Sequence, residues 1–164
     1  MINGKGYLSQ LSAYDTIQAH FILHAMELPT GTIIVSGPVI IEDGKVLLNK
    51  EKKGDKIGPW FFPGGIVEES DASLEAACKR EAKEELGIDL EIIKQMRTTY
   101  RTISDSAKVT LHHFLAQRTG DIIPGDITVE WGWFDINNLP DNCAPNVYEI
   151  LKDKDVREWA SPRK

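Results

Sequence analysis

The sequence predicts one α+β domain in which short strands surround a central helix and further helices flank them. Three observations carry this prediction. The chain has 164 residues, which suits a single hydrophobic core with a small appendage. Hydrophobic residues make up 41% of the chain and charged residues 27%, proportions that are typical of a globular protein. β-rich runs also lie on both sides of one helical segment, 74–86.

Charge and composition exclude several classes of function. The 19 Lys and Arg against 25 Asp and Glu give a net charge of -6 and a pI near 5.2, so we expect no nucleic-acid polymer as a partner. No apolar run approaches the ~20 residues of a membrane-spanning helix, and residues 1–10 lack the layout of a secretory signal. We therefore expect a cytoplasmic protein with no membrane partner. The two cysteines, Cys78 and Cys143, are too few for a disulfide framework or a thiolate zinc site, and we expect both to be reduced.

An N-terminal helix is predicted over 9–28, because its apolar residues recur at helical spacing and Pro29 to Gly31 then break the pattern. We accordingly divide the chain into an N-terminal helical extension, 1–29, and a main domain, 30–164. The amphipathic helix has two possible partners, its own domain or a second subunit, so a homodimer stays open.

Strands and turns lead into the central helix. Three short β-rich runs are predicted strands, at 33–35, 39–41 and 46–48. Asp43 and Gly44 supply a hairpin turn between the last two, and a basic loop follows over 50–59. Ser73 is the predicted N-cap of the helix, and Gly87 is its stop.

The chain returns to strands after the helix. Four are predicted, at 90–93, 98–103, 109–117 and 131–135, and a closing helix is predicted from Val147 to about Trp159. His112 and His113 alternate on the third of these strands, so they face opposite sides. We expect His113 to be packed in the core and His112 to have the better access to a pocket, while Cys78 is a small core filler.

Three glutamates of the central helix occupy an unusual face. At about 100° per residue, Glu84 and Glu85 fall within about 60° of Glu81, on the side of the apolar stripe. Neighbouring carboxylates that are buried cost several kcal/mol unless cations compensate them. Oxygen ligands at this spacing suit a hard divalent cation such as Mg²⁺. The alternative is a charged helix end in solvent, with Lys79 and Lys83 as ion-pair partners.

The segment that begins at Gly65 and continues through 80–88 resembles the Nudix box. Its run Arg-Glu-Ala-Lys-Glu-Glu-Leu-Gly-Ile fits the second half of that pattern at every defined position. One departure concerns the glutamate that the pattern places six residues after the glycine and eight before the arginine. Counting from Gly65 reaches Asp71, whereas counting from Arg80 reaches Ala72, so the loop is one residue longer and Asp71 is the candidate replacement.

The resemblance implies the Nudix fold, an α/β/α sandwich of mixed sheets, over about 30–159. It also implies a pyrophosphohydrolase that uses Mg²⁺ or Mn²⁺ to cleave a diphosphate linkage by water attack on phosphorus. The implied substrate is a small-molecule nucleoside diphosphate derivative, such as a nucleotide sugar, ADP-ribose or a nucleoside triphosphate. The alternative is a Nudix-fold module that binds a nucleotide without cleaving it, and the intact glutamate cluster favours the enzyme.

The resemblance also assigns roles to individual residues. The implied metal ligands are the carbonyl of Gly64 and the carboxylates of Glu81, Glu84 and Glu85. Arg80 is expected to orient these glutamates through charge-assisted hydrogen bonds, and Glu84 to share in catalysis.

Three further residues are weaker candidates. Glu130 precedes a tryptophan strand, as a catalytic glutamate does in many relatives, but Asp126 is its rival and a structural salt bridge is the alternative role for Glu130. Trp60 is a candidate to stack a base or sugar, and Lys56 in the basic loop is a candidate to meet distal phosphates. Core packing for the tryptophan and a solvated loop for the lysine are the competing interpretations.

Overall fold

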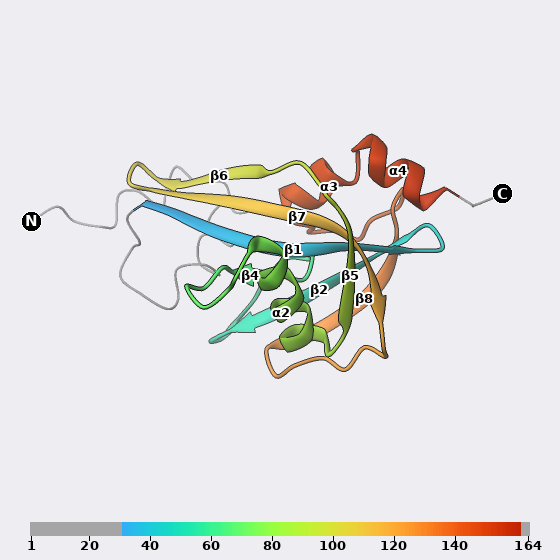
Figure 1. Cartoon of the computed structure of the whole chain (residues 1–164), viewed down its shortest axis with the longest axis horizontal. Helices are drawn as coiled ribbons and strands as arrows, with labels where there is room; N and C mark the ends of the chain where they lie inside the picture. Colours follow the sequence, from blue (N-terminus) through green and yellow to red (C-terminus); the bar gives the residue numbers. More distant parts are fainter. Residues whose placement is uncertain (1–30, 162–164) are drawn as a thin grey trace, which may run out of the picture.

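The computed structural model describes residues 31–161 and forms a mixed sheet with helices on both of its faces (Figure 1). The strands are β1 (Gly31–Glu42), β2 (Lys45–Lys53), β3 (Lys56–Ile57), β4 (Gly65–Ile66), β5 (Asp89–Gln95), β6 (Thr99–Ser104), β7 (Ala107–Thr119) and β8 (Thr128–Asp135). The helices are α2 (Leu74–Leu86), α3 (Pro145–Ile150) and α4 (Lys154–Ala160). The helix predicted over 9–28 lies outside the described residues. None of the described helices has the length and apolar character needed to cross a membrane.

The sheet is mixed because β1 and β7 run parallel at its centre, paired from Gly31 with Ala107 to Ile40 with Ala116. The central path runs β3-β2-β1-β7-β5, while β4, β6 and β8 pair with β1, β7 and β2 respectively. The predicted hairpin is confirmed: Asp43 and Gly44 both have positive φ, of 48° and 75°, and turn β1 antiparallel into β2.

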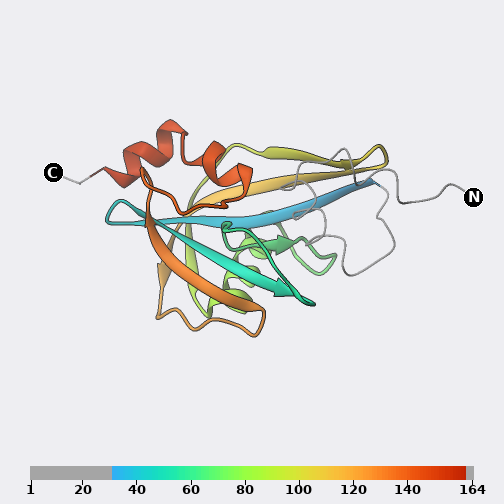
Figure 2. The ribbon, with the colours of Figure 1, turned by 180° about the vertical axis from the view of Figure 1, so that it is seen from behind.

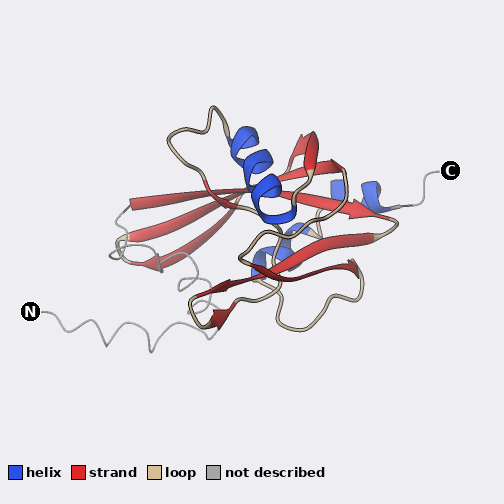
Figure 3. Cartoon of the chain, turned by 90° about the horizontal axis from the view of Figure 1, so that it is seen from below, coloured by secondary structure: helices blue, strands red, loops and turns tan. Residues whose placement is uncertain are grey.

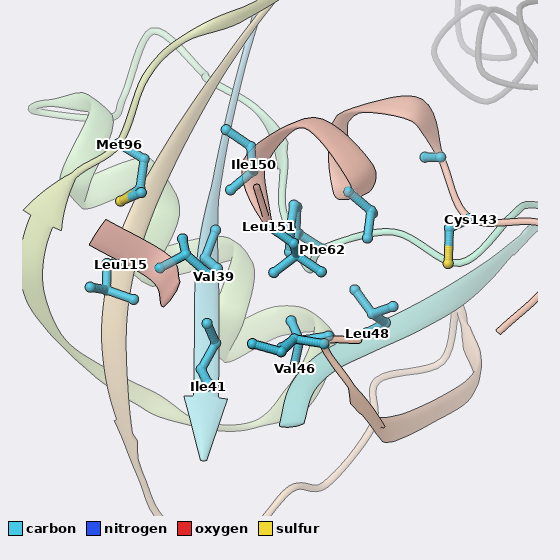
Figure 4. Packing of buried hydrophobic residues seen from close by; sticks show 14 residues of the cluster. Val39, Ile41, Val46, Leu48, Phe62, Met96, Leu115, Cys143, Ile150 and Leu151 are labelled. Carbon is cyan, nitrogen blue, oxygen red and sulfur yellow. The ribbon is translucent and has the colours of Figure 1, made fainter. Parts of the chain in front are cut away.

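Alternation along β1 divides the core between the two faces of the sheet. Val39 and Ile41 pack in a cluster with residues of α3 and α4, whereas Ile40 packs with α2. Figure 4 shows Val39 and Ile41 pointing toward the first cluster. In Figure 1 α2 lies in front of the strands, and in the reversed view of Figure 2 the strands cover it.

The central helix begins and ends where the sequence predicts. The Ser73 side chain accepts a hydrogen bond from the backbone N–H of Ala76 over 3.1 Å, and Gly87 ends the helix in the left-handed region at φ 69°. Figure 3 shows the loop 67–73 leaving the strands and returning into α2. The last turn of α2 is also tied to the loop before β8, because the N–H of Gly125 donates to the carbonyl of Glu85 over 2.8 Å.

Three sequence predictions require correction. The separate runs 33–35 and 39–41 belong to one strand, because the parallel pairing with β7 continues without interruption between them. The predicted loop 50–59 contains the end of β2 and the short strand β3, which pair with each other. The closing helix is two helices, α3 and α4, separated by a turn at 151–153.

Candidate active site

Glu85 is buried at the end of α2 and is held by two donors. Its Oε2 accepts hydrogen bonds from the backbone N–H of Gly64 over 2.9 Å and from Nδ2 of Asn49 over 3.3 Å. The residue is only 3% exposed. Thr128 Oγ1 donates to the Glu85 carbonyl over 3.0 Å, which ties the helix to β8. The carboxylate is therefore fixed where α2, β2 and the loop before β4 meet.

Glu81 faces the same loop from one turn earlier. A Cβ atom on Gly65 would lie 2.5 Å from the Glu81 carboxyl atoms, so glycine leaves the space that this side chain fills. Gly64 has φ 145°, and a Cβ there would lie 2.6 Å from the carbonyl oxygen of Ser36 on β1. The glycine pair thus brings bare backbone against both Glu81 and Glu85, and a ligand role for the Gly64 carbonyl stays a prediction.

Glu84 lies at the rim of the site. The buried positions of α2 are Ala77, Cys78, Glu81, Ala82, Glu85 and Leu86. They centre about 50° from Glu81 on the side of Ala82, which leaves Glu84 about 110° away. Its side chain is 59% exposed. The expectation of inward-facing glutamates therefore holds for Glu81 and Glu85 but not for Glu84.

Arg80 bridges Glu81 and Glu84 on the outer side of the site. Its Nη1 donates to Glu81 Oε1 over 2.7 Å and to Glu84 Oε2 over 3.3 Å, which supports the predicted orienting role. Its remaining donors reach Asp71 and the carbonyl of Ile66. Lys83, the alternative partner for the glutamates, instead pairs with Asp89 at 3.0 Å.

Burial raises the pKa of Glu81 and raises the pKa of Glu85 well above its ordinary value. Loss of solvation is the largest cause in both cases. Glu51 raises the pKa of Glu85 further through its charge, whereas the Arg80 guanidinium works in the opposite direction on Glu81. The site therefore holds acids whose charged forms need additional positive charge.

Glu51 is an acidic residue of this site that sequence reasoning missed. The predicted loop over 50–59 includes this residue, but β2 continues to Lys53 and Glu51 is only 3% exposed. The signal that points to it is alternation along β2: Leu47 packs with α2, Asn49 bonds Glu85, and Glu51 is next on the same face.

Glu130 and Asp126 are not among the residues that contact the box glutamates in the structure. Glu130 lies on β8, is 50% exposed on its side chain and pairs with Lys50 at 3.2 Å, the contact that the salt-bridge alternative anticipates. Asp126 lies in the exposed turn before β8. A catalytic role for either acid stays a prediction.

Neither of the two candidate substrate-binding residues is among the residues that line the cavity at Gly64 and Gly65. Trp60 packs edge-on against Phe134, with ring centroids 4.7 Å apart, and Lys50 Nζ sits 4.4 Å from its ring centroid. Lys56 is exposed on the short strand β3. These contacts match core packing for Trp60 and a solvated hairpin for Lys56, and their substrate roles stay predictions.

An apolar cavity of about 120 Å³ adjoins the Gly64–Gly65 backbone and Glu51. The cavity has apolar walls and several polar lining residues. Val35, Phe61, Phe62 and Leu111 supply the apolar walls, and Glu51, Lys53, Gly64, Gly65, His112, His113 and Asn146 are also among the lining residues. His113 is buried and meets the Phe62 ring edge-on at 5.5 Å, which confirms it as a packed histidine. Cys78 is fully buried, as predicted, and burial raises the pKa of its thiol to about 12.

The family follows from this geometry together with a direct comparison. A model of the NUDIX domain matches residues 32–154, which include β1, the glycine pair, α2 and the cavity. The chain belongs to the Nudix family. It is a Nudix hydrolase, of the class that acts on phosphoric anhydrides. The predicted family and the mixed-sheet α+β fold are confirmed.

Several proteins that are similar to this chain are named as hydrolases. The chain is 32% identical over 118 residues to an ADP-ribose pyrophosphatase of Methanocaldococcus jannaschii, covering 70% of this chain and 68% of that one. It is 28% identical to an oxidized purine nucleoside triphosphate hydrolase of Danio rerio, covering 62% of this chain and 65% of the relative. The crystal structure of a MutT NUDIX hydrolase from Burkholderia pseudomallei superposes with a TM-score of 0.68 at 27% identity, covering 76% of this chain and 98% of that one.

Proposed function

We propose that this protein is a Mg²⁺-dependent pyrophosphohydrolase that cleaves the diphosphate linkage of a small nucleoside diphosphate derivative. The observation that carries the proposal is the burial of Glu81 and Glu85 against the Gly64–Gly65 backbone, which also lines an apolar cavity. Buried carboxylates are costly unless positive charge compensates them. A divalent cation bound by these acids would supply that charge and could also bind the phosphates of a substrate. The cavity offers apolar walls for a base or sugar beside it.

The residues present suit a hard divalent cation. Within residues 31–161, no three His, Cys, Asp or Glu side chains already enclose a common point. However, Glu51 Oε1 is buried without a hydrogen-bond partner, and carboxylate and carbonyl oxygens are the donors that Mg²⁺ prefers. Glu81 and Glu85, with the Gly64 carbonyl and Glu84 at the rim, are the groups that would hold the ion. When bound, a divalent cation supplies positive charge against the diphosphate and makes water more acidic.

The surrounding residues keep the acids in position for this chemistry. The N–H of Gly64 and the amide of Asn49 hold Glu85, while Arg80 holds Glu81 and Glu84. Because Glu84 is the most exposed of the three box glutamates, it is the one placed to accept a proton from water at the rim. Water then adds to one phosphorus, the bridging P–O bond breaks, and two phosphate-bearing products leave without a covalent enzyme intermediate.

A substrate panel with Mg²⁺ tests the proposal. Purified protein is incubated with ADP-ribose, nucleotide sugars, diadenosine polyphosphates and nucleoside triphosphates, and the products are separated by ion-exchange chromatography. We expect turnover of at least one compound, its loss with EDTA, and its loss in Glu85→Gln but not in Glu91→Gln, which removes an exposed glutamate of β5. Binding of a nucleotide without turnover of any compound would instead assign a non-catalytic nucleotide-binding module.

A further inference from the structure

Positive charge lies closer to one end of the acidic cluster formed by Glu51, Glu81, Glu84 and Glu85 than to the other. Arg80 Nη1 lies between Glu81 and Glu84, at 2.7 and 3.3 Å from their oxygens. At the other end, Glu85 receives only the neutral donors of Gly64 and Asn49. The ion pair on that side is the longer one between Lys53 Nζ and Glu51 Oε2, at 3.6 Å, so the Glu51 and Glu85 side of the cluster is the less compensated one.

Glu51 is directed into the site by the course of β2. Its neighbour Lys50 pairs with Glu130 on β8, and the register shift that follows leaves the extra residue, Val129, on β8, so alternation along β2 continues from Asn49 to Glu51. Glu51 is 3% exposed, its Oε1 has no hydrogen-bond partner, and it borders the cavity together with Gly64 and Gly65. A buried carboxylate oxygen without a donor is costly, so the position calls for a bound partner.

The neighbouring groups satisfy Glu51 only in part. The Lys53 ammonium is 3.6 Å from Glu51 Oε2, which is longer than a direct hydrogen bond. The Glu85 carboxylate lies within hydrogen-bonding reach of Glu51, but two ionised carboxylates bring only acceptors to each other. A cation between them satisfies both groups at once, and its oxygen donors are of the type that hard divalent ions take.

We propose that Glu51 is an additional carboxylate ligand of the divalent-cation site, acting with Glu85 beside the Gly64–Gly65 backbone. The inference rests on the proposed function for the presence of the ion, and it extends that site to a strand residue outside the 65–88 segment. It also gives β2 a direct part in the site, so that the ion joins α2 to the strand.

The competing role for Glu51 is to share a proton with Glu85 and merely keep it in place. Glutamine separates the two roles, because its amide nitrogen donates a hydrogen bond to Glu85 as a protonated carboxyl would but adds no anionic ligand. Glu51→Leu is the second variant. It replaces the carboxyl by an apolar group of similar size, which avoids leaving a buried polar atom unpaired.

The experiment is a titration of the metal-free full chain with Mn²⁺ alone. Binding is monitored by isothermal titration calorimetry and by the electron paramagnetic resonance signal of free Mn²⁺. We expect Glu51→Gln and Glu51→Leu each to raise the Mn²⁺ Kd about tenfold or more. The matched control Glu91→Gln removes the same charge from an exposed site and is expected to stay within about twofold. Thermal unfolding without metal is measured in parallel, and the Tm of Glu51→Gln is expected to equal or exceed that of the wild type.

Mn²⁺ affinity in Glu51→Gln within about twofold of the wild type would overturn the proposal and assign the shared-proton role. If Glu51→Gln does not fold, Glu51→Leu decides by the same criterion. Failure of the proposed function has a different signature. In that case Mn²⁺ binding depends on Glu51 as expected, while the substrate panel shows no turnover with the wild-type protein.

Discussion

Arg80 and Asp71 form a two-pronged ion pair, in which Nε donates to Oδ1 over 2.9 Å and Nη2 donates to Oδ2 over 2.8 Å. The Arg80 guanidinium, helped by the backbone N–H of Glu68, holds the pKa of Asp71 at about 2. Asp71 in turn raises the pKa of Arg80, so the guanidinium is fixed and charged at every working pH. Asp71, the candidate replacement for the missing glutamate of the box pattern, thus anchors Arg80, which in turn holds Glu81 and Glu84.

Loss of this anchor should reduce turnover more than substrate binding. Asp71→Asn removes the charge opposite Arg80, and Arg80→Lys removes the planar fork that reaches Asp71 and Glu81 together. We expect kcat to fall by about 10- to 100-fold in each variant with a smaller change in KM. The measurement is steady-state kinetics on the best substrate of the panel. Glu68→Gln is the control, because that exposed carboxylate lies 3.9 Å from Arg80 and does not form the fork. Wild-type kcat in both variants would refute the anchoring role.

Neutralising Glu81 or Glu85 should lower the activity of the protein without lowering its stability. Glu81→Gln and Glu85→Gln keep the shape of the side chain, and a glutamine carbonyl can still accept the hydrogen bond from Gly64. Each change also removes a carboxylate whose pKa is raised by burial and by the charge of Glu51. We therefore expect turnover to fall by about 10²-fold or more, and the free energy of unfolding without metal to stay equal or rise. Steady-state kinetics measures the turnover, and urea unfolding measures the free energy of unfolding. Unchanged turnover in both variants would show that Glu81 and Glu85 are not part of the active site.

Local signals in the sequence were sufficient for the features that depend on neighbouring residues. The Ser73 cap, the Gly87 stop and the Asp43–Gly44 turn are set by the backbone preferences of one or two residues, and the structure confirms all three. Helical periodicity places Glu81 and Glu85 beside the apolar residues of α2, and the structure buries both.

Features that depend on segments distant in the chain could not be predicted from the sequence and are seen only in the structure. Glu51 is buried because β2 continues along β8, a partner about 80 residues away in the chain, as the pairing of Lys50 with Glu130 shows. Glu84 is exposed because the sheet covers α2 on the side of Ala82, and no property of the helix alone fixes that direction. Pairing partners and the orientation of a helix on a sheet are tertiary properties, which a pattern along one segment does not encode.

Gly65 should be essential because of the space that it leaves for Glu81. A Cβ at this position would lie 2.5 Å from the Glu81 carboxyl atoms, and the backbone does not otherwise require glycine because Gly65 is not among the positive-φ residues. Gly65→Ala should therefore fold, displace the Glu81 carboxylate and lower kcat by about 10- to 100-fold, with a matching loss of Mn²⁺ affinity. Kinetics and calorimetry measure the two effects. Wild-type Mn²⁺ affinity in Gly65→Ala would show that the position of Glu81 does not matter to the ion.

His113 should make the stability of the protein depend on pH. Burial lowers the pKa of this histidine to about 4. Its Nδ1 lies 3.2 Å from the Leu111 carbonyl and its Nε2 lies 3.0 Å from Nδ2 of Asn146. Those contacts suit a neutral ring that donates from Nδ1 and accepts at Nε2. Protonation would place a second N–H against the Asn146 amide, so the folded state resists the charged form.

The sign of the effect follows from the two pKa values. Between about pH 6.5, where an unfolded histidine titrates, and about pH 4, the unfolded chain binds a proton that the folded chain does not. The free energy of unfolding should therefore decrease as the pH falls through this window, by about 3 kcal/mol in total from this residue, and should not depend on it above the window. Urea unfolding of the wild type and of His113→Gln at about pH 7.5, 5.5 and 4.5 measures the difference in slope. His113→Gln is expected to lose stability less steeply toward acid, and parallel slopes for the two proteins would exclude His113 as the titrating group.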